Sequence, residues 1–307
     1  MTAPGDRAAE RDPAGAEDDH ATLPDGSVTW RMLLAEAGER LGSATDARRI
    51  VERASGWEGA DHHLRLDDVV TARPAAHFEQ MVERRAAGEP LQYVLGAWSF
   101  RSLDLYVDAR VLIPRPETES VVEAALGELR RLAPRSPLAV DLGTGSGAIA
   151  LSVAREMPGV EVWGVDRSAD ALAVARANAS GLGRAGTAVR LVEGSWFQPL
   201  PPLLRGQVDL VVSNPPYVAE REVDDLPPEV AQWEPRSALV AGPTGLEQIE
   251  AIVAEAPGWL SRPGALVVEV APHQHRAVVA LALGAGFGEA EVRPDLAGRP
   301  RALVARV

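Results

Sequence analysis

LAVDLGTGSG, residues 138–147, decides the fold of this chain. Its first five residues form an apolar run interrupted only by Asp141, a pattern typical of a buried parallel strand. The glycines that follow allow a tight turn and a close approach of the backbone to a ligand. The stretch therefore predicts the first strand, turn and helix of a doubly wound α/β domain, with a ligand site at the turn.

Strand-like and helix-like segments alternate from this stretch to the end of the chain, apart from a long loop expected at 218–242. The predicted strands cover residues 138–142, 160–165, 188–192, 208–212, 265–270, 289–293 and 301–307. Such alternation predicts a parallel sheet that binds its ligand at the carboxyl ends of the strands. Residues 294–300 are too few for a helical crossover, so the last two strands should be antiparallel neighbours. We expect a Rossmann-like seven-stranded sheet with an antiparallel last strand.

Three further segments precede this domain, which we place at 117–307. Residues 1–24 contain almost no large apolar side chains and are expected to form a disordered tail. Residues 25–88 have helical periodicity, with Ser27 or Thr29 as the first cap, and predict a small helical domain. Residues 89–116 mix aromatic and aliphatic residues with glycine and predict a connecting β-hairpin.

Composition narrows the possible functions. The chain has 307 residues and no cysteine, which excludes disulfides, thiolate nucleophiles and cysteine metal sites. His62 and His63 are interpreted as a surface pair in a loop, and His273 and His275 have no evident third ligand, so no metal site is predicted. No apolar run could span a membrane and no signal-peptide pattern is present, so we expect a cytoplasmic protein. The net charge of −13 argues against stable binding of nucleic acid, which requires clustered basic residues.

Asp166 stands at the end of the second predicted strand, the next strand along the chain after the glycine-rich turn. A carboxylate in this position can bind both hydroxyls of a ribose. Enzymes that use NAD(P) or FAD have the same layout, so these residues predict a nucleoside cofactor without specifying which one.

Asn214-Pro215-Pro216-Tyr217 follows the fourth predicted strand. The two prolines fix φ and remove two backbone donors, and each also restricts the residue before it. The predicted result is a stiff corner that presents the Asn214 amide, two proline carbonyls and the ring of Tyr217. Such a corner suits a planar group with N–H donors, although this motif alone could also be an ordinary proline turn after a strand.

The order of the three motifs matches a class I S-adenosylmethionine-dependent methyltransferase. Within that class the chain, from Trp30 to Val307, closely resembles the HemK-type glutamine methyltransferases that modify peptide chain release factors. The resemblance also rests on IPRPETE at 113–119, SWF at 195–197 and DLAGRPR at 295–301. Adenine N6 methyltransferases share the Asn-Pro-Pro-Tyr motif, but its combination with the segment at 113–119 is more specific.

The resemblance implies S-adenosyl-L-methionine as cofactor. It implies that Asp166 binds the ribose, that Trp196 packs on the adenine, and that Asn214 also borders the cofactor. Ser195 stands where the family often has an acid for the adenine amino group, and a hydroxyl would accept that bond more weakly. The residues expected at the methionine end of the cofactor are Gly143, Thr144, Gly145, Ser146 and Gly147.

The resemblance also implies the substrate, the glutamine of the Gly-Gly-Gln motif in class 1 release factors, methylated on its side-chain nitrogen N5. Asn214 and the carbonyl of Pro215 would accept its two N–H bonds, with Tyr217 against the amide plane as the third catalytic residue. Pro216 and Arg115 would complete the substrate site.

Three other functions remain open at this point. A glutamine of a ribosomal protein would need the same catalytic corner. Adenine N6 methylation of nucleic acid is disfavoured by the acidic charge and by the absence of a basic recognition domain. A module that only binds cofactor and partner is disfavoured because the whole acceptor corner is present.

Overall fold

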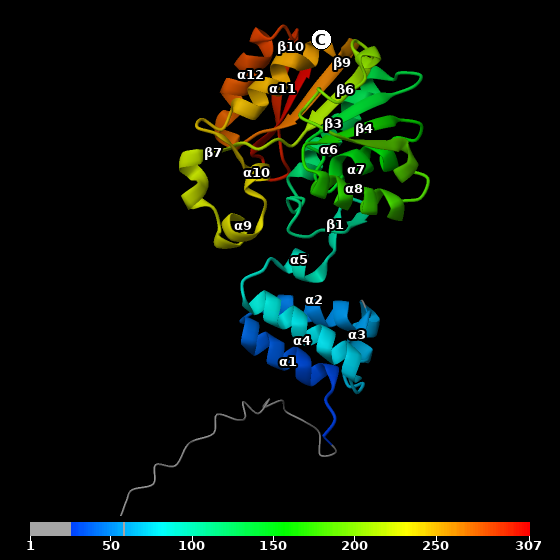
Figure 1. The fold of residues 1–307 in the computed structure, drawn as a ribbon, viewed down its shortest axis with the longest axis vertical. Coiled ribbons are helices and arrows are strands. Elements are labelled where there is room, and N and C mark those ends of the chain that lie inside the picture. Colours follow the sequence, from blue (N-terminus) through cyan, green and yellow to red (C-terminus); the bar gives the residue numbers. More distant parts are fainter. Residues whose placement is uncertain (1–25, 58) are drawn as a thin grey trace, which may run out of the picture. The chain divides into compact units, whose positions relative to one another are not determined.

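The computed structural model describes residues 26–57 and 59–307, so the predicted tail over 1–24 lies outside the described residues. The chain divides into two compact units, with the boundary between Ala86 and Ala87 (Figure 1). Within the described residues, no helix combines the length and apolar character that crossing a membrane requires.

The N-terminal unit is helical. Side-chain caps begin its first two helices, since Thr29 Oγ1 accepts from the Met32 N–H and Ser43 Oγ from the Asp46 N–H. Gly42 and Gly56 end the same helices in the left-handed conformation that glycine adopts at low cost. The helices are α1 (Trp30–Leu41), α2 (Ala44–Ser55), α3 (Ala60–Leu64) and α4 (Ala72–Ala86).

Apolar faces of α1, α2 and α4 form the core of the N-terminal unit. Trp30 packs edge-on against Phe78, with ring centroids 6.4 Å apart. Ile50 and Val51 from α2 and Met81 from α4 are almost completely buried in the same core. Helical spacing of apolar residues thus accounts for this unit.

The C-terminal unit begins with a short helix, α5 (Leu91–Leu95), which starts after Pro90 and ends at the left-handed Gly96. The antiparallel hairpin of β1 (Trp98–Phe100) and β2 (Leu103–Leu105) follows, so only part of the segment 89–116 is a hairpin. Arg101 in its turn binds Glu156 and Glu123, and its backbone N–H donates to Glu119. The hairpin is thereby fixed to the helices of the α/β fold.

A seven-stranded sheet runs through the C-terminal unit in the order β10-β11-β9-β6-β3-β4-β5 (Figure 1). The pairs among β9, β6, β3, β4 and β5 are parallel, whereas β11 is antiparallel to both of its neighbours. The predicted seven-stranded sheet with an antiparallel last strand is confirmed. The strands are β3 (Leu138–Leu142), β4 (Glu161–Asp166), β5 (Val189–Glu193), β6 (Val208–Ser213), β9 (Leu260–Glu269), β10 (Glu289–Pro294) and β11 (Pro300–Arg306).

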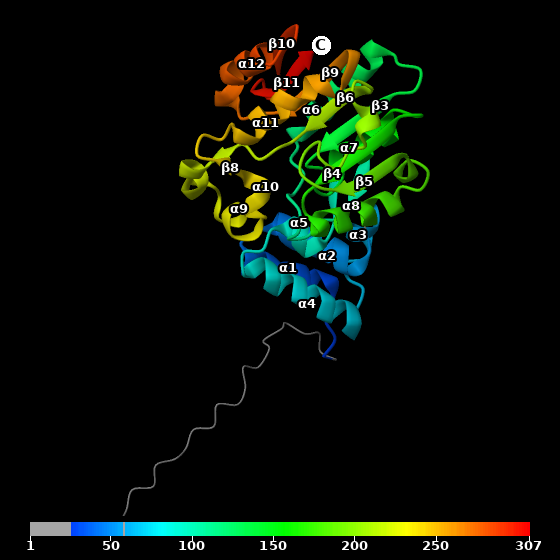
Figure 2. The same ribbon diagram turned by 45° about the horizontal axis from the view of Figure 1, so that its top comes forward.

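Alternate residues of the central strands point to opposite faces of the sheet, as strand geometry requires. Leu210 and Val212 join a core with α6, α7 and α8, whereas Val211 joins a second core with α11 and α12. Figures 1 and 2 show these two helical layers on either side of the sheet. The helices are α6 (Thr118–Leu132), α7 (Ala148–Glu156), α8 (Ala169–Gly181), α11 (Glu247–Glu255) and α12 (His275–Gly284).

Residues 218–242, expected as a loop, contain short ordered elements instead. Two short strands, β7 (Val218–Ala219) and β8 (Val240–Gly242), pair in parallel and bring the ends of the segment together. Between them lie the 3-10 helix η3 (Glu220–Asp225) and the helices α9 (Pro228–Trp233) and α10 (Arg236–Leu239). These helices are too short to produce the apolar periodicity that sequence reading requires. Other 3-10 turns are η1 (Gly186–Ala188), η2 (Pro202–Leu204), η4 (Ala256–Gly258) and η5 (Pro272–Gln274).

Candidate functional site

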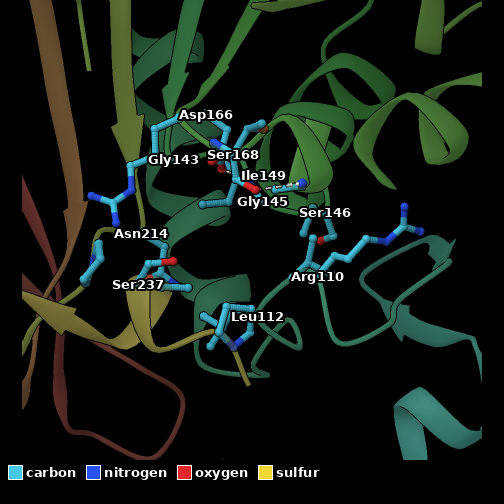
Figure 3. Close-up of a pocket in the computed structure, with 18 of the residues that line it drawn as sticks. Arg110, Leu112, Gly143, Gly145, Ser146, Ile149, Asp166, Ser168, Asn214 and Ser237 are labelled. Atoms are coloured by element: carbon cyan, nitrogen blue, oxygen red, sulfur yellow. Dashed lines mark hydrogen bonds between the residues drawn. The ribbon is translucent and has the colours of Figure 1, made fainter. Parts of the chain in front are cut away.

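A cavity lies at the carboxyl ends of β3, β4, β5 and β6 (Figure 3). It is lined by the turns after these strands, by residues 110–114 and by part of the segment from Pro235 to Gln248. In Figure 3, Gly145, Ser146 and Ile149 lie on one side of the cavity and Asn214 and Ser237 on the other. The residues singled out from the sequence that line it are Gly143, Thr144, Gly145, Ser146, Asp166, Ser195, Trp196, Asn214 and Pro216.

The glycine-rich turn is a left-handed backbone path that requires glycine. Gly143, Gly145 and Gly147 have φ of +72°, +56° and +85°. The N–H groups of Gly143 and Thr144 both donate to the Val165 carbonyl of the neighbouring strand, at 2.8 and 2.9 Å. Gly147 does not line the cavity: a Cβ there would lie 2.9 Å from Leu151 Cδ1. Gly147 therefore serves close packing of α7, and the other two glycines border the cavity.

Asp166 holds the turn from the next strand. Its Oδ2 accepts from the Gly145 N–H at 2.9 Å, and its Oδ1 accepts from the Ser168 N–H at 2.9 Å. Each oxygen keeps a further lone pair, and the residue lines the cavity. A carboxylate in this geometry can bind a vicinal diol while it stabilises the glycine-rich turn.

Trp196 has an unusual backbone conformation for a large residue, with φ of +45°. Its ring borders Gly143, where an added Cβ would lie 3.6 Å from the indole Cζ3. Gly194 and Ser195 line the cavity beside it. The site thus has a flat aromatic wall next to a hydroxyl acceptor.

Asp141 is completely buried beneath the turn. Its Oδ2 accepts from the Thr144 hydroxyl at 2.7 Å and from the Ala150 N–H at 3.0 Å. Its Oδ1 has no hydrogen-bond partner within the described residues. Burial, reinforced by the nearby charge of Asp166, raises the pKa of Asp141 to about 7. Above that pH the ionised Asp141 places negative charge under the turn, which makes this end of the cavity suitable for a cationic ligand.

The corner after β6 is joined to two residues that sequence reasoning missed. Asn214 Nδ2 donates to Thr118 Oγ1 at 3.3 Å, and the Thr118 hydroxyl donates to Glu269 Oε2 at 2.7 Å. The Tyr217 hydroxyl donates to Glu269 Oε1 at 3.3 Å. Neither Tyr217 nor Pro215 is among the residues that line the cavity. Burial raises the pKa of Glu269 to about 7, although the bond from Thr118 and the charge of Arg301 oppose the shift.

Gln274, also missed, holds the far side of the same corner. Its Nε2 donates to the carbonyls of Tyr217 and Gly245 at 3.1 and 3.0 Å, while its Oε1 accepts from the Ala271 N–H. Gly245 has to be glycine, because a Cβ there would lie 2.7 Å from the backbone carbonyl oxygen of Tyr217. The prolines stiffen the corner locally, and Gln274 fixes it to the start of α12.

Gln274→Met will lower the free energy of unfolding by about 1–3 kcal/mol, because one buried carbonyl, one partly buried carbonyl and one buried N–H lose their partner. Urea denaturation monitored by fluorescence measures the difference. Gln232→Met, at an exposed position of α9, is the control and should stay within about 0.5 kcal/mol of the parent. Equal stability of the two variants would contradict this assignment.

Arg115 does not line the cavity but pairs with Glu234. Glu234 is buried, its pKa is raised by burial, and its second oxygen accepts from the Ile113 N–H. The pair ties the segment before α6 to the segment that contains Pro235 and Ser237. Both segments form walls of the cavity, so Arg115 stabilises the site from outside it.

Signals for the missed residues were weak but present. Thr118 lies within the IPRPETE segment, and Glu269 is a lone acid at the end of an apolar strand. An acid in such a position has to be paired when it is buried, which makes it a candidate for a site network. Gln274 gave no signal, since a glutamine between two histidines in an exposed-looking turn is unremarkable.

The arrangement can therefore bind a nucleoside by Asp166 and an aromatic wall, hold a cationic group over a buried carboxylate, and present an amide oxygen nearby. Among the described residues that line it there is no histidine, cysteine or lysine, and Asp166, the carboxylate present, already accepts two backbone N–H bonds. Chemistry that depends on orientation and on acceptance of hydrogen bonds suits such a site.

Known proteins agree with this picture. The family model described as "PrmC N-terminal domain" matches residues 29–96, and "Methyltransferase small domain" matches residues 127–229. The solved catalytic domain of hMettl16, in complex with MAT2A 3′UTR hairpin 6, aligns with a TM-score of 0.53 over 84% of this chain and 91% of that chain. At 13% identity that likeness shows the fold alone.

Full-length relatives are more specific. A release factor glutamine methyltransferase of Burkholderia pseudomallei is 43% identical over 92% of this chain and 97% of its own length. Relatives with the same description from Moorella thermoacetica and Deinococcus radiodurans are 41% and 40% identical, each matched over 98% of its length. Since these relatives are at least 40% identical over 90% or more of this chain, and the family models match parts of both units, the chain belongs to the family of release factor glutamine methyltransferases.

Proposed function

We propose that this enzyme transfers a methyl group from S-adenosyl-L-methionine to N5 of the glutamine in the Gly-Gly-Gln motif of class 1 peptide chain release factors. The observation that carries the proposal is the Asn214 corner, whose amide NH₂ is bound by Thr118 on the wall of a cavity that starts at the glycine-rich turn. A release-factor substrate places the reaction in the cytoplasm, where translation occurs.

The residues present fit the cofactor. Asp166 would bind the ribose, Trp196 would pack on the adenine, and the turn at Gly143–Ser146 would border the methionine end. Above its pKa of about 7 the buried Asp141, whose Oδ1 has no partner within the described residues, would supply negative charge that favours a cationic sulfonium above the turn. When bound, S-adenosylmethionine supplies an electrophilic methyl group on that sulfonium.

The chain's own contribution is orientation of a poor nucleophile. An amide nitrogen is weakly nucleophilic because its lone pair is delocalised into the carbonyl group. Asn214 Oδ1, on the cavity wall, would accept one of its N–H bonds. The carbonyl of the next residue, Pro215, which lies just behind the lining residues Asn214 and Pro216, would accept the other, and together they would hold the nitrogen towards the donor. Both acceptors gain strength as positive charge develops on that nitrogen, so they favour the transition state over the ground state. The product then loses its extra proton to water.

Two other substrates share this geometry. A glutamine of a ribosomal protein would meet the same acceptors, and so would the amino group of an adenine. The match of residues 29–96 to a domain of this methyltransferase family supports a release factor, and the net charge of −13 disfavours nucleic acid.

Incubation with methyl-labelled S-adenosylmethionine and three separate substrates tests the proposal: a purified release factor, ribosomal proteins, and DNA or RNA. We expect label on the release factor, and none on a release factor whose Gly-Gly-Gln glutamine is changed to alanine. Label that appears only on ribosomal protein or only on nucleic acid would refute it.

A further inference from the structure

Glu269 is the feature of the site that the proposed reaction leaves unused. It has no exposed surface, it ends β9, and it does not line the cavity. Two hydroxyl groups from different parts of the chain, Thr118 on α6 and Tyr217 after β6, donate to its two oxygens. Burial of an ionised carboxyl group costs free energy, which hydrogen bonds and charges from its partners have to offset. Its position one hydrogen bond beyond Thr118 links it to the catalytic corner.

Ionised Glu269 fixes the direction of the hydrogen bonds that lead from it. A carboxylate can only accept, so the single O–H of Thr118 must donate to it. Thr118 Oγ1 then has only lone pairs left for Asn214, so only the NH₂ end of the Asn214 amide can face it. The Asn214 oxygen, which accepts no hydrogen bond from the described residues, is left for a ligand.

We propose that Glu269 is a positioning residue that acts through Thr118 to keep the oxygen of the Asn214 amide, and not its NH₂ group, turned to the substrate. A flipped amide would present N–H groups to a substrate that itself offers N–H groups, and two donors cannot pair. The proposal rests on the proposed function for the identity of the substrate, but it applies to any substrate that donates N–H to Asn214.

The groups around Glu269 set the pH at which this device works. Arg301 of β11 lies 4.0 Å away and favours the ionised form, as do the bonds from Thr118 and Tyr217. Glu117, before α6, opposes it, and Arg301 is shared with Glu117 and Asp295 at 3.9 Å each. Because burial raises the pKa of Glu269 to about 7, methyl transfer should weaken as the pH falls from about 8 to about 6. Protonated Glu269 could donate to Thr118 and so release the Asn214 amide.

Glu269→Gln tests the proposal, since it keeps the shape but adds a donor. We expect single-turnover methyl transfer to fall about 10- to 100-fold, as for a misoriented acceptor. At saturating S-adenosylmethionine, which removes any effect of Asp141 on cofactor binding, the fall in rate between pH 8 and 6 should disappear. Binding of S-adenosylmethionine should change less than about threefold, because Glu269 is outside the cavity. Thr118→Val should give the same loss, and Thr118→Ser, which restores the hydroxyl, should recover most of the rate.

Glu128→Gln is the matched control. Glu128 is also a buried acid, but it binds Arg131, Arg293 and Arg306 away from the cavity. This variant should lose stability and keep its rate and pH profile. Wild-type rates in Glu269→Gln or in Thr118→Val would overturn the proposal. So would a loss of rate that Thr118→Ser fails to recover, or an equal loss in Glu128→Gln.

Two arrangements keep this test separate from the proposed function. Each variant is compared with the parent on whichever substrate the parent labels, so label on a ribosomal protein or nucleic acid would refute only the proposed function.

In protein labelled with ¹⁵N-asparagine, the side-chain NH₂ signals of Asn214 report its bond to Thr118 without any substrate. These signals should shift in Glu269→Gln and Thr118→Val; unchanged signals would overturn the positioning role, whatever the activity. If Glu269→Gln fails to fold, Thr118→Val and Thr118→Ser give the same comparison.

Discussion

Asn214→Ala will reduce the rate of methyl transfer to a release factor by about 100- to 1,000-fold, the usual cost of removing one preorganised hydrogen-bonding group at a reacting centre. The variant loses the amide oxygen that accepts a substrate N–H, while the neighbouring prolines still define the corner. Because the other cofactor contacts remain, binding of S-adenosylmethionine should change much less than the rate. Single-turnover kinetics and calorimetric titration measure the two effects separately.

Gln207→Ala is the control for this substitution. Gln207 is exposed and directly precedes the same strand, β6, at the end opposite to the cavity. It should leave both rate and cofactor affinity unchanged. Turnover of Asn214→Ala near that of the parent would show that the mechanism proposed for the corner is wrong.

Asp166→Ala will weaken binding of S-adenosylmethionine by about 100-fold or more. Its carboxylate would supply two charge-assisted hydrogen bonds to the ribose, each worth about 1.5–3 kcal/mol, and every 1.4 kcal/mol is about a factor of ten in affinity. The Gly145 N–H also loses its acceptor, which loosens the turn at the methionine end. Titration of the protein with the cofactor gives the affinity directly.

The rate of Asp166→Ala at saturating cofactor should recover to within about tenfold of the parent, because Asp166 does not reach the reacting nitrogen in the proposed mechanism. Asp170→Ala is the control: Asp170 is an exposed acid in the first turn of α8 that does not line the cavity. Similar affinities for the two variants would exclude Asp166 as the ribose ligand.

Much of the fold could be predicted from the sequence because its signals are local. The apolar run at 138–142, the glycines after it and the short connection at 294–300 each constrain a few neighbouring residues, and the strands formed there. Ser168 caps α8 through its own hydroxyl, again within one turn. The short elements within 218–242 were missed, since two strands and two helices of so few residues have no period to detect.

Some residues of the candidate site could be recognised from the sequence, and others could not. Asp166 and Asn214 were recognisable because each directly follows a predicted strand. Parallel strands bring their carboxyl ends to one edge of the sheet, so both residues were expected at the same site. The role of Tyr217 and Arg115 at the substrate stays a prediction, but the structure shows their partners: Tyr217 bonds to Glu269 and Arg115 to Glu234. Which side chain a long polar residue meets depends on packing that no local pattern contains.

By itself the sequence determined the doubly wound sheet, the glycine turn and the stiff proline corner, because glycine and proline act on their own φ angles. Only the tertiary structure decided how the corner is oriented. The bond from Asn214 to Thr118 joins residues 96 positions apart, and that from Thr118 to Glu269 joins residues 151 apart. Glu269, which accepts from the hydroxyls of Thr118 and Tyr217, can be recognised as part of the site only once folding has buried it beside these donors.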